Sequence, residues 1–493
     1  MNVITNPFEK ETGSFRLRLP FYLTLLILSM VICAYLIAKG GVSMAVSLVM
    51  LPVIGFYLTV LFLKPITGLY SAVVVGFIIL GTPRYFPSLS VIGVGMDGIL
   101  ILTYLALIFN RFYNKVDWKP AKNDATVLAG LWLGYALLQF ANPEAHSKVA
   151  WLAGLRGVSL YMFLVIPLAL ILIDTKKKLD AFLILWGIMS ILVTLKGIQQ
   201  NFLGVDYAEK AWLDRGAAAT HILFGKLRVF SFLSDAGNFG ANQAYSGIVA
   251  TFVSFSEKSR KRKIFYITVA VLGFYGMLLS GTRGAISVPL AALFLFFVLK
   301  KNKVVMIFGF ILILIVFGFF KYTTIGNQNQ QIRRMRSGFD PNDRSLQVRL
   351  ENQKRLKAYL ATRPIGGGIG HAGVKAQKYL PNAFLSNVAT DSWYVMIWAE
   401  QGIVGLILHL FILFYIIIKS GYLIMFKLKN PEIILKMSAL TVGMFGIMAA
   451  AYGNEVLGTP PTGILIYVSM ALMLNSERFD DPLPEVNKKL LPM

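Results

Sequence analysis

Two arginines that stand beside apolar segments are the residues of this chain best suited to bind an anion. Arg283 lies in the short stretch Ser280-Gly-Thr-Arg-Gly284, between two apolar runs, where glycines allow a tight turn. A guanidinium fixed at a membrane boundary is costly unless an anion pairs with it, and its planar fork suits phosphate oxygens. The residues leave two interpretations: an anion site, or an arginine at a helix end that reaches toward water.

The second arginine, Arg228, precedes a stretch rich in glycine and asparagine, Ser234–Asn242, which leads into the next apolar run. Backbone and side-chain amides of such a stretch can line a polar cavity. The alternative is an ordinary solvated loop.

Three acidic residues are candidates for proton transfer. Asp391 stands where a long polar segment re-enters an apolar run, so it can accept a proton from a sugar hydroxyl or cap the helix that follows. Glu400 lies within that run, where a carboxylate is a candidate functional residue. Glu455 lies in the loop Tyr452-Gly-Asn-Glu455.

A long basic segment, Lys321–Asp391, follows the apolar runs after Arg283 and ends at the first of these carboxylates. Asp343 to Thr362 has apolar residues at helical spacing among cations that include Arg349, which predicts an amphipathic helix.

The glycines after Pro364 let backbone amides approach an anion, so Gly368 and Gly370 are predicted binding residues. No Gly-Lys-Ser/Thr follows, which argues against a nucleotide site, and the basic helix can alternatively lie on anionic lipid.

The composition indicates a membrane protein. Of 493 residues, 56% are hydrophobic and 15% are charged, against about 25% charged in soluble chains. The net charge of +24 comes mostly from short loops, so it indicates membrane topology and no nucleic-acid partner. The histidines lack metal-ligand spacing, so neither a metal nor a cofactor is expected.

Apolar runs near membrane-spanning length recur along the whole chain. They predict an all-α integral membrane protein, a polytopic bundle of about 12–14 transmembrane helices in a single domain over residues 1–493. Residues 321–391 form a large, partly helical outer loop, and residues 475–493 form a tail. The runs are Phe21–Ala38, Val42–Leu63, Ile66–Thr82, Leu89–Phe109, Ala125–Ala141, Val158–Ile173, Ala181–Gly197, Phe239–Phe255, Ile264–Leu279, Ala285–Leu299, Val304–Phe320, Ser392–Ile418, Ile433–Ala451 and Pro461–Leu474.

Lysine and arginine in alternate short loops give the orientation, because such loops stay in the cytoplasm. Examples are the basic stretches 176–178, 258–263 and 300–303. The alternation places both termini in the cytoplasm. It places Arg228, Arg283 and the loop 321–391 on the outer side.

Several short patches together resemble the O-antigen ligase and O-antigen polymerase superfamily of bacterial membrane glycosyltransferases. They are Ser280-Gly-Thr-Arg-Gly284, Arg363-Pro-Ile-Gly-Gly-Gly-Ile-Gly370 and Glu400-Gln-Gly-Ile-Val-Gly405, with Arg228 followed by Asn238 and Asn242. The patches lie in the second half of the chain, in the order and on the side that the family shows.

The resemblance implies a glycan on undecaprenyl pyrophosphate as substrate, a glycan or lipid acceptor, and an active face in the periplasm of the bacterial inner membrane. Arg228 and Arg283 would bind the diphosphate leaving group, with Arg349 as a third candidate. Glu400 is a further predicted substrate-binding residue. A base, Asp391, would activate the acceptor hydroxyl without metal or nucleotide.

One departure from the family pattern bears on the acceptor. Ligases of the family carry a histidine where this chain has Thr390-Asp391-Ser392, which favours a polymerase of O-antigen or exopolysaccharide repeats. A transporter or flippase for lipid-linked glycans or small anions is the alternative, with Lys196 as its intramembrane cation. A structural scaffold is a third possibility.

Overall fold

The computed structural model describes residues 12–86, 92–113, 116–223, 225–328, 330–340 and 342–480. Two compact units are distinguished, Met1–Pro65 and Ile66–Met493. The first contains one long helix, α1 (Thr12–Leu63), which covers two of the predicted apolar runs and bends at Gly41. There φ is +61°, a conformation that glycine adopts without steric cost. That all runs form a single membrane domain stays a prediction.

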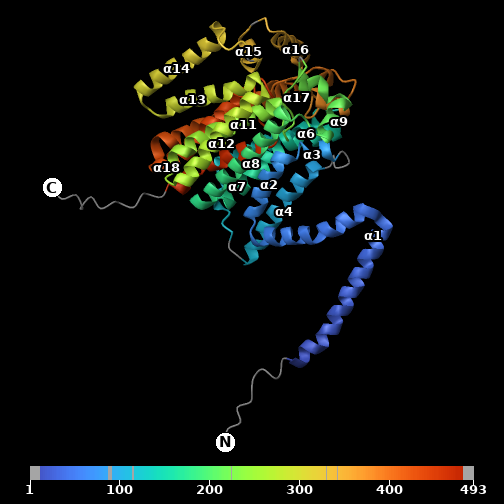
Figure 1. Ribbon diagram of the computed structural model, residues 1–493. Helices are drawn as coiled ribbons and strands as arrows, with labels where there is room; N and C mark the ends of the chain where they lie inside the picture. The colour runs from blue at the N-terminus through green and yellow to red at the C-terminus, as the bar shows by residue number, and fades with distance from the viewer. Residues whose placement is uncertain are drawn as a thin grey trace, which may run out of the picture. The chain divides into compact units, whose positions relative to one another are not determined.

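The second unit is built almost entirely of helices (Figure 1). Its long helices follow the predicted apolar runs, and short helices occupy the loops. The helices of ten residues or more are α2 (Ile66–Ile78), α4 (Ile92–Tyr113), α5 (Asp124–Leu138), α7 (Tyr161–Leu172), α8 (Lys176–Phe202), α11 (Ala236–Ser256), α12 (Arg260–Ser280), α13 (Ser287–Leu299), α14 (Lys303–Tyr322), α16 (Arg344–Leu360), α17 (Trp393–Tyr422), α18 (Pro431–Ala450) and α19 (Thr462–Leu474).

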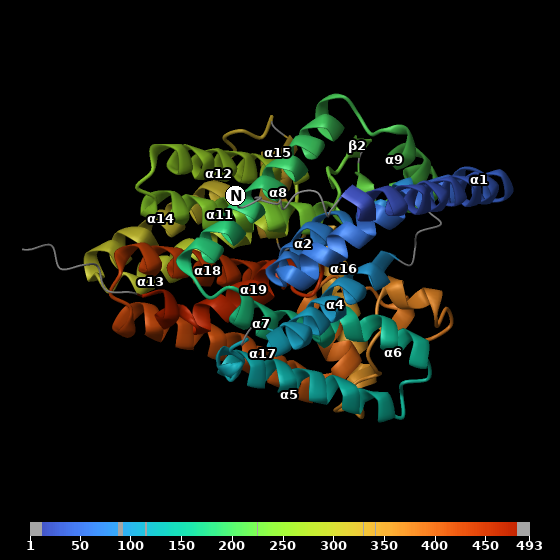
Figure 2. The same cartoon turned by 90° about the horizontal axis from the view of Figure 1, so that it is seen from below.

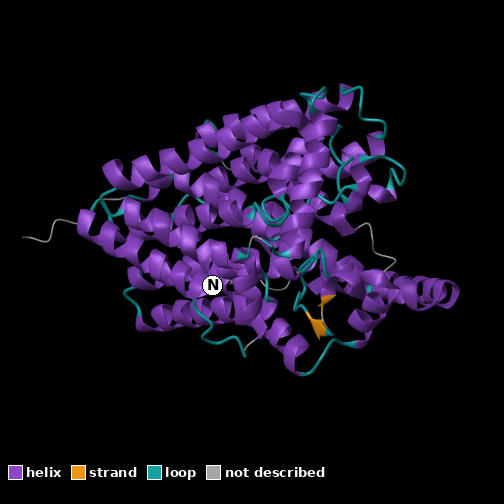
Figure 3. Cartoon of the chain, turned by 90° about the horizontal axis from the view of Figure 1, so that it is seen from above, coloured by secondary structure: helices purple, strands orange, loops and turns teal. Residues whose placement is uncertain are grey.

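Shorter elements complete the second unit. The strands β1 (Ile222–Leu223) and β2 (Lys226–Leu227) form an antiparallel pair, the small orange ribbon in Figure 3. The short α-helices are α3 (Thr82–Tyr85), α6 (Lys148–Leu155), α9 (Tyr207–Trp212), α10 (Ala218–His221) and α15 (Gln330–Arg336).

The helix lengths confirm an all-α polytopic membrane protein. Among the described residues, eight helices are long and apolar enough to cross a membrane, and five shorter apolar helices accompany them. The eight are fewer than the predicted 12–14, so the exact number of membrane-spanning helices stays a prediction. Of the predicted tail, residues 481–493 lie outside the described part, while Phe479 at its start is buried.

Helix α11 forms the centre of one half of the bundle. It packs against α12 and α18 (Figure 1), and nearly all of its residues are buried. Its first half is polar, and hydrogen bonds satisfy part of it: the Gln243 Oε1 accepts from Ser190 and Thr194, both at 2.9 Å. A Cβ on Gly273 would lie 2.8 Å from the Gln243 carbonyl oxygen, so a glycine is needed for this close contact.

The other half of the bundle consists of α5, α7, α17 and α19, which pack together (Figure 2). α17 is bent at Gly402, where φ is +67°. The axis of α17 changes direction at this bend, two residues after Glu400.

A buried ion cluster closes the end of the bundle at which α12 and α18 begin. The Lys436 ammonium, 1% exposed, lies 2.6 Å from carboxylate oxygens of Asp180 and Glu432 and 3.5 Å from Glu257. Lys436 lies inside a predicted apolar run, as Lys196 does. The three carboxylates offset part of the cost of burying its charge, and the candidate site lies at the opposite end of these helices.

Candidate functional site

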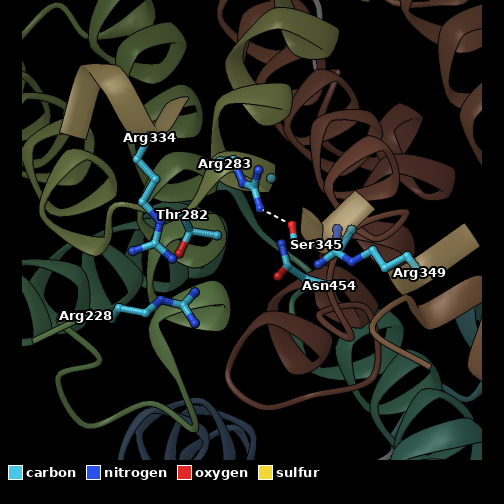
Figure 4. Close-up of a pocket in the computed structure, with 9 residues that line it drawn as sticks. Arg228, Thr282, Arg283, Arg334, Ser345, Arg349 and Asn454 are labelled. Carbon is cyan, nitrogen blue, oxygen red and sulfur yellow. Dashed lines mark hydrogen bonds between the residues drawn. The ribbon is translucent and has the colours of Figure 1, made fainter. Parts of the chain in front are cut away.

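Four arginines from separate parts of the chain face one cavity of about 190 Å³ (Figure 4). The cavity lies between the end of α12, the helix α16 and the loop after α18. The structure thus brings together the predicted residues Arg228, Arg283 and Arg349 and adds Arg334. The full lining is Arg228, Thr282, Gly284, Arg283, Arg334, Ser345, Arg349, Gly453 and Asn454.

The turn between α12 and α13 holds Arg283 in place. α12 ends at Gly281 with φ of +55°, and the Thr282 hydroxyl donates to the Ala236 carbonyl at 2.9 Å. The sequence predicted this tight turn. Because the turn is tied to the start of α11, the Arg283 guanidinium projects into the cavity from a fixed backbone.

Arg283 is the most fully bonded of the four arginines. Its guanidinium lies 2.7 Å from the Asp343 carboxylate and donates to the Ser337 hydroxyl at 3.1 Å and to the Ser345 hydroxyl. These partners belong to the outer loop, so the arginine anchors that loop over the cavity.

Asp343 has two roles at the start of α16. Its Oδ1 accepts from the backbone of Ser345 at 3.0 Å and of Leu346 at 3.1 Å, which caps the helix. Burial raises the pKa of the Asp343 carboxyl, but bonds from Arg283 and Ser345 outweigh burial and lower the pKa to about 2. The Asp343 carboxylate therefore stays ionised at neutral pH beside the Arg283 guanidinium.

Arg228 follows strand β2 and has few partners. Its side chain donates to the Thr220 carbonyl at 3.3 Å, and its buried Nε has no hydrogen-bond partner among the described residues. Burial lowers the pKa of Arg228, Asp235 opposes this, and the charges of Arg283 and Arg349 lower it further. These electrostatic contacts show that the cations repel one another across the cavity.

From Ala236 the stretch Ser234–Asn242 is the buried start of α11, so the solvated-loop alternative was wrong, and residues 229–235 form the loop that leads into it. Arg84 holds this loop: its guanidinium donates to the carbonyls of Ser231 at 2.7 Å and Ser234 at 3.1 Å, and to that of Leu233. The loop ends at Asp235, which caps α11 by accepting from Gly237 N at 2.7 Å. The start of α11 and Arg228 are thus positioned together.

Arg349 connects α16 to the two loops that carry the candidate carboxylates. It donates to the Gly453 carbonyl at 3.3 Å, and its Nε lies 3.8 Å from the Asp391 carboxylate. Asp391 adopts a φ of +48° just before α17. The helix cap is Ser392, whose hydroxyl accepts from Val395 N at 3.4 Å, so the interpretation of Asp391 as the cap was wrong.

Sequence reasoning missed Arg334, on α15, and Asn454. Burial, with the charges of Arg228 and Arg283, lowers the pKa of Arg334 to about 10. No described carboxylate forms an ion pair with it. The signal that pointed to it is the run Arg333-Arg334-Met335-Arg336, an unusual concentration of cations in the outer loop.

The predicted residues Gly368, Gly370 and Glu400 lie outside the cavity lining. A Cβ on Gly370 would lie 2.0 Å from the Ala150 carbonyl oxygen, and one on Gly368 would lie 2.8 Å from the Ala145 Cβ. Glu400 is buried and accepts from Ala372 N at 3.4 Å. In the structure these residues pack the outer loop onto α6 and α17, and a binding role for them stays a prediction.

The cavity as a whole can hold a multiply charged anion. Among the described residues, Asp343 and Asp391 are the carboxylates that form ion pairs with the four arginines. The excess of positive charge therefore remains available to a ligand.

A family model described as O-Antigen ligase matches residues 268–410, from α12 to α17. The match includes Arg283, Arg334, Arg349 and Asp391, while Arg228 and Asn454 lie outside it. No match was found among curated proteins. The chain is a polytopic membrane protein, and the match over residues 268–410 supports a relationship to the O-antigen ligase superfamily.

Proposed function

We propose that the chain transfers oligosaccharide repeats from an undecaprenyl diphosphate carrier to a glycan acceptor at the periplasmic face of the bacterial inner membrane. The observation that carries this proposal is the cavity in which four arginines converge at one end of the helix bundle. The O-antigen ligase domain supports a glycosyltransferase-like enzyme that acts on lipid-linked glycans.

Unpaired donors in the cavity support an anionic ligand. Buried atoms without a hydrogen-bond partner among the described residues include the Arg228 Nε and the Asn454 Nδ2. A buried donor left unpaired costs about 1–3 kcal/mol. Diphosphate oxygens would satisfy both donors and would reduce the repulsion between the arginines.

In the proposed reaction, negative charge develops on the diphosphate as it leaves. The acceptor hydroxyl oxygen attacks the anomeric carbon, and the bond from that carbon to the diphosphate oxygen breaks. Positive charge held rigidly around the diphosphate stabilises the departing anion more strongly than the bound substrate. Because arginines supply this charge, the proposed reaction uses neither a nucleotide nor a metal.

A carboxylate beside the cavity would take the acceptor proton, a role for which the sequence alone suggested Asp391. With Thr390-Asp391-Ser392 in place of the family's histidine, we propose a polymerase of O-antigen or exopolysaccharide repeats.

The structure gives no support to the transporter alternative at Lys196. Its ammonium lies 2.8 Å from Asp206 and 3.2 Å from Glu209, in the segment that follows its own helix. A cation satisfied by local partners at a helix end is not available to a translocated ion.

The test uses purified protein in nanodiscs and the undecaprenyl diphosphate-linked repeat that accumulates in a strain lacking the gene. Longer glycans should form without nucleotide, and Arg228→Ala combined with Arg283→Ala should lower the rate at least about 100-fold. Arg260→Ala is the matched control, an exposed arginine at the far end of α12. Translocation of the repeat across vesicles without chain growth would contradict the proposal.

A further inference from the structure

A second cluster of charged groups lies directly beside the arginine cavity. It centres on Glu455, the residue after Asn454, which lines the cavity. The chain around Glu455 is hydrogen-bonded to the segment that carries Asp391: Trp393 N donates to the Ala451 carbonyl at 3.0 Å, and the Ser392 hydroxyl donates to the same oxygen at 3.2 Å. Each carboxylate lies next to a residue that lines the cavity: Glu455 follows Asn454, and Asp391 pairs with Arg349.

Two partners orient the Glu455 carboxylate. The buried Thr390 hydroxyl donates to Oε1 at 2.6 Å, and the Lys375 ammonium donates to Oε2 at 2.9 Å. A carboxylate offers about four lone-pair sites, so each oxygen can still accept a further hydrogen bond. The Glu455 side chain is 22% exposed, which leaves it within reach of a substrate hydroxyl.

A glycine keeps the approach to Glu455 open. Gly373 has a φ of +74°, and a Cβ there would lie 3.1 Å from the Thr390 hydroxyl and 4.0 Å from the Glu455 Oε1. Any side chain at this position would crowd the hydrogen bond and cover part of the carboxylate.

Asp391 is placed differently. Its side chain is 49% exposed and has Arg349 as its ion-pair partner at 3.8 Å. Arg349 faces the cavity that would hold the leaving group. Asp391 is thus on the diphosphate side, where it balances and positions an arginine.

We propose, on the basis of the function proposed above, that Glu455 is the catalytic base for the acceptor hydroxyl and that Asp391 positions Arg349. The acceptor oxygen forms its bond to the anomeric carbon while its proton passes to a Glu455 oxygen. The electron pair of the broken carbon–oxygen bond leaves with the lipid diphosphate. Glu455 then returns the proton to water.

The experiment compares Glu455→Gln, Glu455→Asp and Asp391→Asn in a strain lacking the gene, with polysaccharide measured per amount of membrane-inserted protein. Glu455→Gln should lower polymer at least about 100-fold, since a positioned base contributes about 10²–10⁴-fold. Glu455→Asp should restore part of the activity, and Asp391→Asn should lower it by about tenfold or less. Glu351→Gln, exposed on α16, is the matched control.

A binding measurement separates this inference from the function on which it depends. Purified Glu455→Gln should bind undecaprenyl diphosphate as the wild type does. Equal losses in Glu455→Gln and Asp391→Asn, or weaker diphosphate binding by Glu455→Gln, would overturn the assignment of the base. Full activity of the Arg228→Ala, Arg283→Ala double variant would instead overturn the proposed function.

A second pair of variants applies if Glu455→Gln does not fold. Thr390→Ser keeps the hydroxyl that orients Glu455, and Thr390→Val removes it. We expect near-normal polymer from Thr390→Ser and at least about a tenfold loss from Thr390→Val, because the valine removes an oriented hydrogen bond to a charged group. Equal activities of the two variants would contradict the role of Glu455.

Discussion

At the scale of single residues, the geometry of each guanidinium matters as much as its charge. Arg283 reaches Asp343, Ser337 and Ser345 at once, through a planar group whose donors are fixed relative to one another. A lysine has one ammonium on a flexible chain and cannot hold the outer loop while it faces a ligand. The four arginines are therefore not interchangeable with lysines.

Arg283→Lys should retain the positive charge but lower the transfer rate by about tenfold or more, because it loses at least one charge-assisted hydrogen bond of about 1.5–3 kcal/mol. The rate of glycan growth per amount of folded protein measures this. Lys258→Arg, at an exposed position far from the cavity, is the control and should leave the rate unchanged. Wild-type rates in Arg283→Lys would show that charge alone is sufficient.

At the scale of elements, the glycine-rich stretch has a packing function that its sequence did not reveal. A Cβ on Gly366 would lie 2.3 Å from the Gly402 nitrogen, at the bend in α17. In the sequence these glycines follow a predicted helix, which suggested that their backbone amides could bind an anion. Their contacts with α6 and α17 depend on segments far away in the chain, which local patterns do not encode.

Gly370→Ala should lower thermal stability and the amount of inserted protein. The residue has φ of +77°, a conformation that costs other residues about 1–2 kcal/mol, and the added methyl would overlap the Ala150 carbonyl. Thermal unfolding of the purified protein and its abundance in membranes measure this.

Gly134→Ala is the matched control, because a Cβ there meets nothing within 4 Å. It should leave stability unchanged or raise it slightly. A stable Gly370→Ala protein with reduced activity would instead support the binding role first predicted for this loop.

Local sequence was enough to predict most elements of the fold. The apolar runs became helices, the turn at Arg283 formed as expected, and the helix predicted over Asp343–Thr362 is α16. Hydropathy and capping preferences are local properties, so the sequence contains them directly. It did not predict that Ser392 rather than Asp391 caps α17, because both residue types are good caps.

At the scale of the whole molecule, the cavity exists only in the assembled chain. The residues that line it come from distant parts of the chain. Arg228 follows strand β2, and Arg283 follows the transmembrane helix α12. Arg334 and Arg349 belong to the outer loop, and Asn454 lies after α18. Family resemblance suggested the first two and Arg349. The cation run around Arg334 marks the segment but not which arginine faces the cavity, and nothing local to Asn454 distinguishes it from other polar loop residues, so their place in the cavity required the folded structure.

A ligand that binds all these segments must stabilise the folded chain. Binding to the native state alone adds about 2.7 kcal/mol when the ligand is present at 100 times its Kd. Undecaprenyl diphosphate is the direct probe, and undecaprenyl monophosphate controls for the lipid tail.

The most direct test is thermal unfolding of the purified protein in detergent with increasing undecaprenyl diphosphate. We predict a rise in Tm for the wild type and for Arg260→Ala, a smaller rise with the monophosphate, and at least about tenfold weaker binding when Arg228→Ala and Arg283→Ala are combined. Equal stabilisation of the wild type and of this double variant would contradict the claim that the arginine cavity binds the diphosphate.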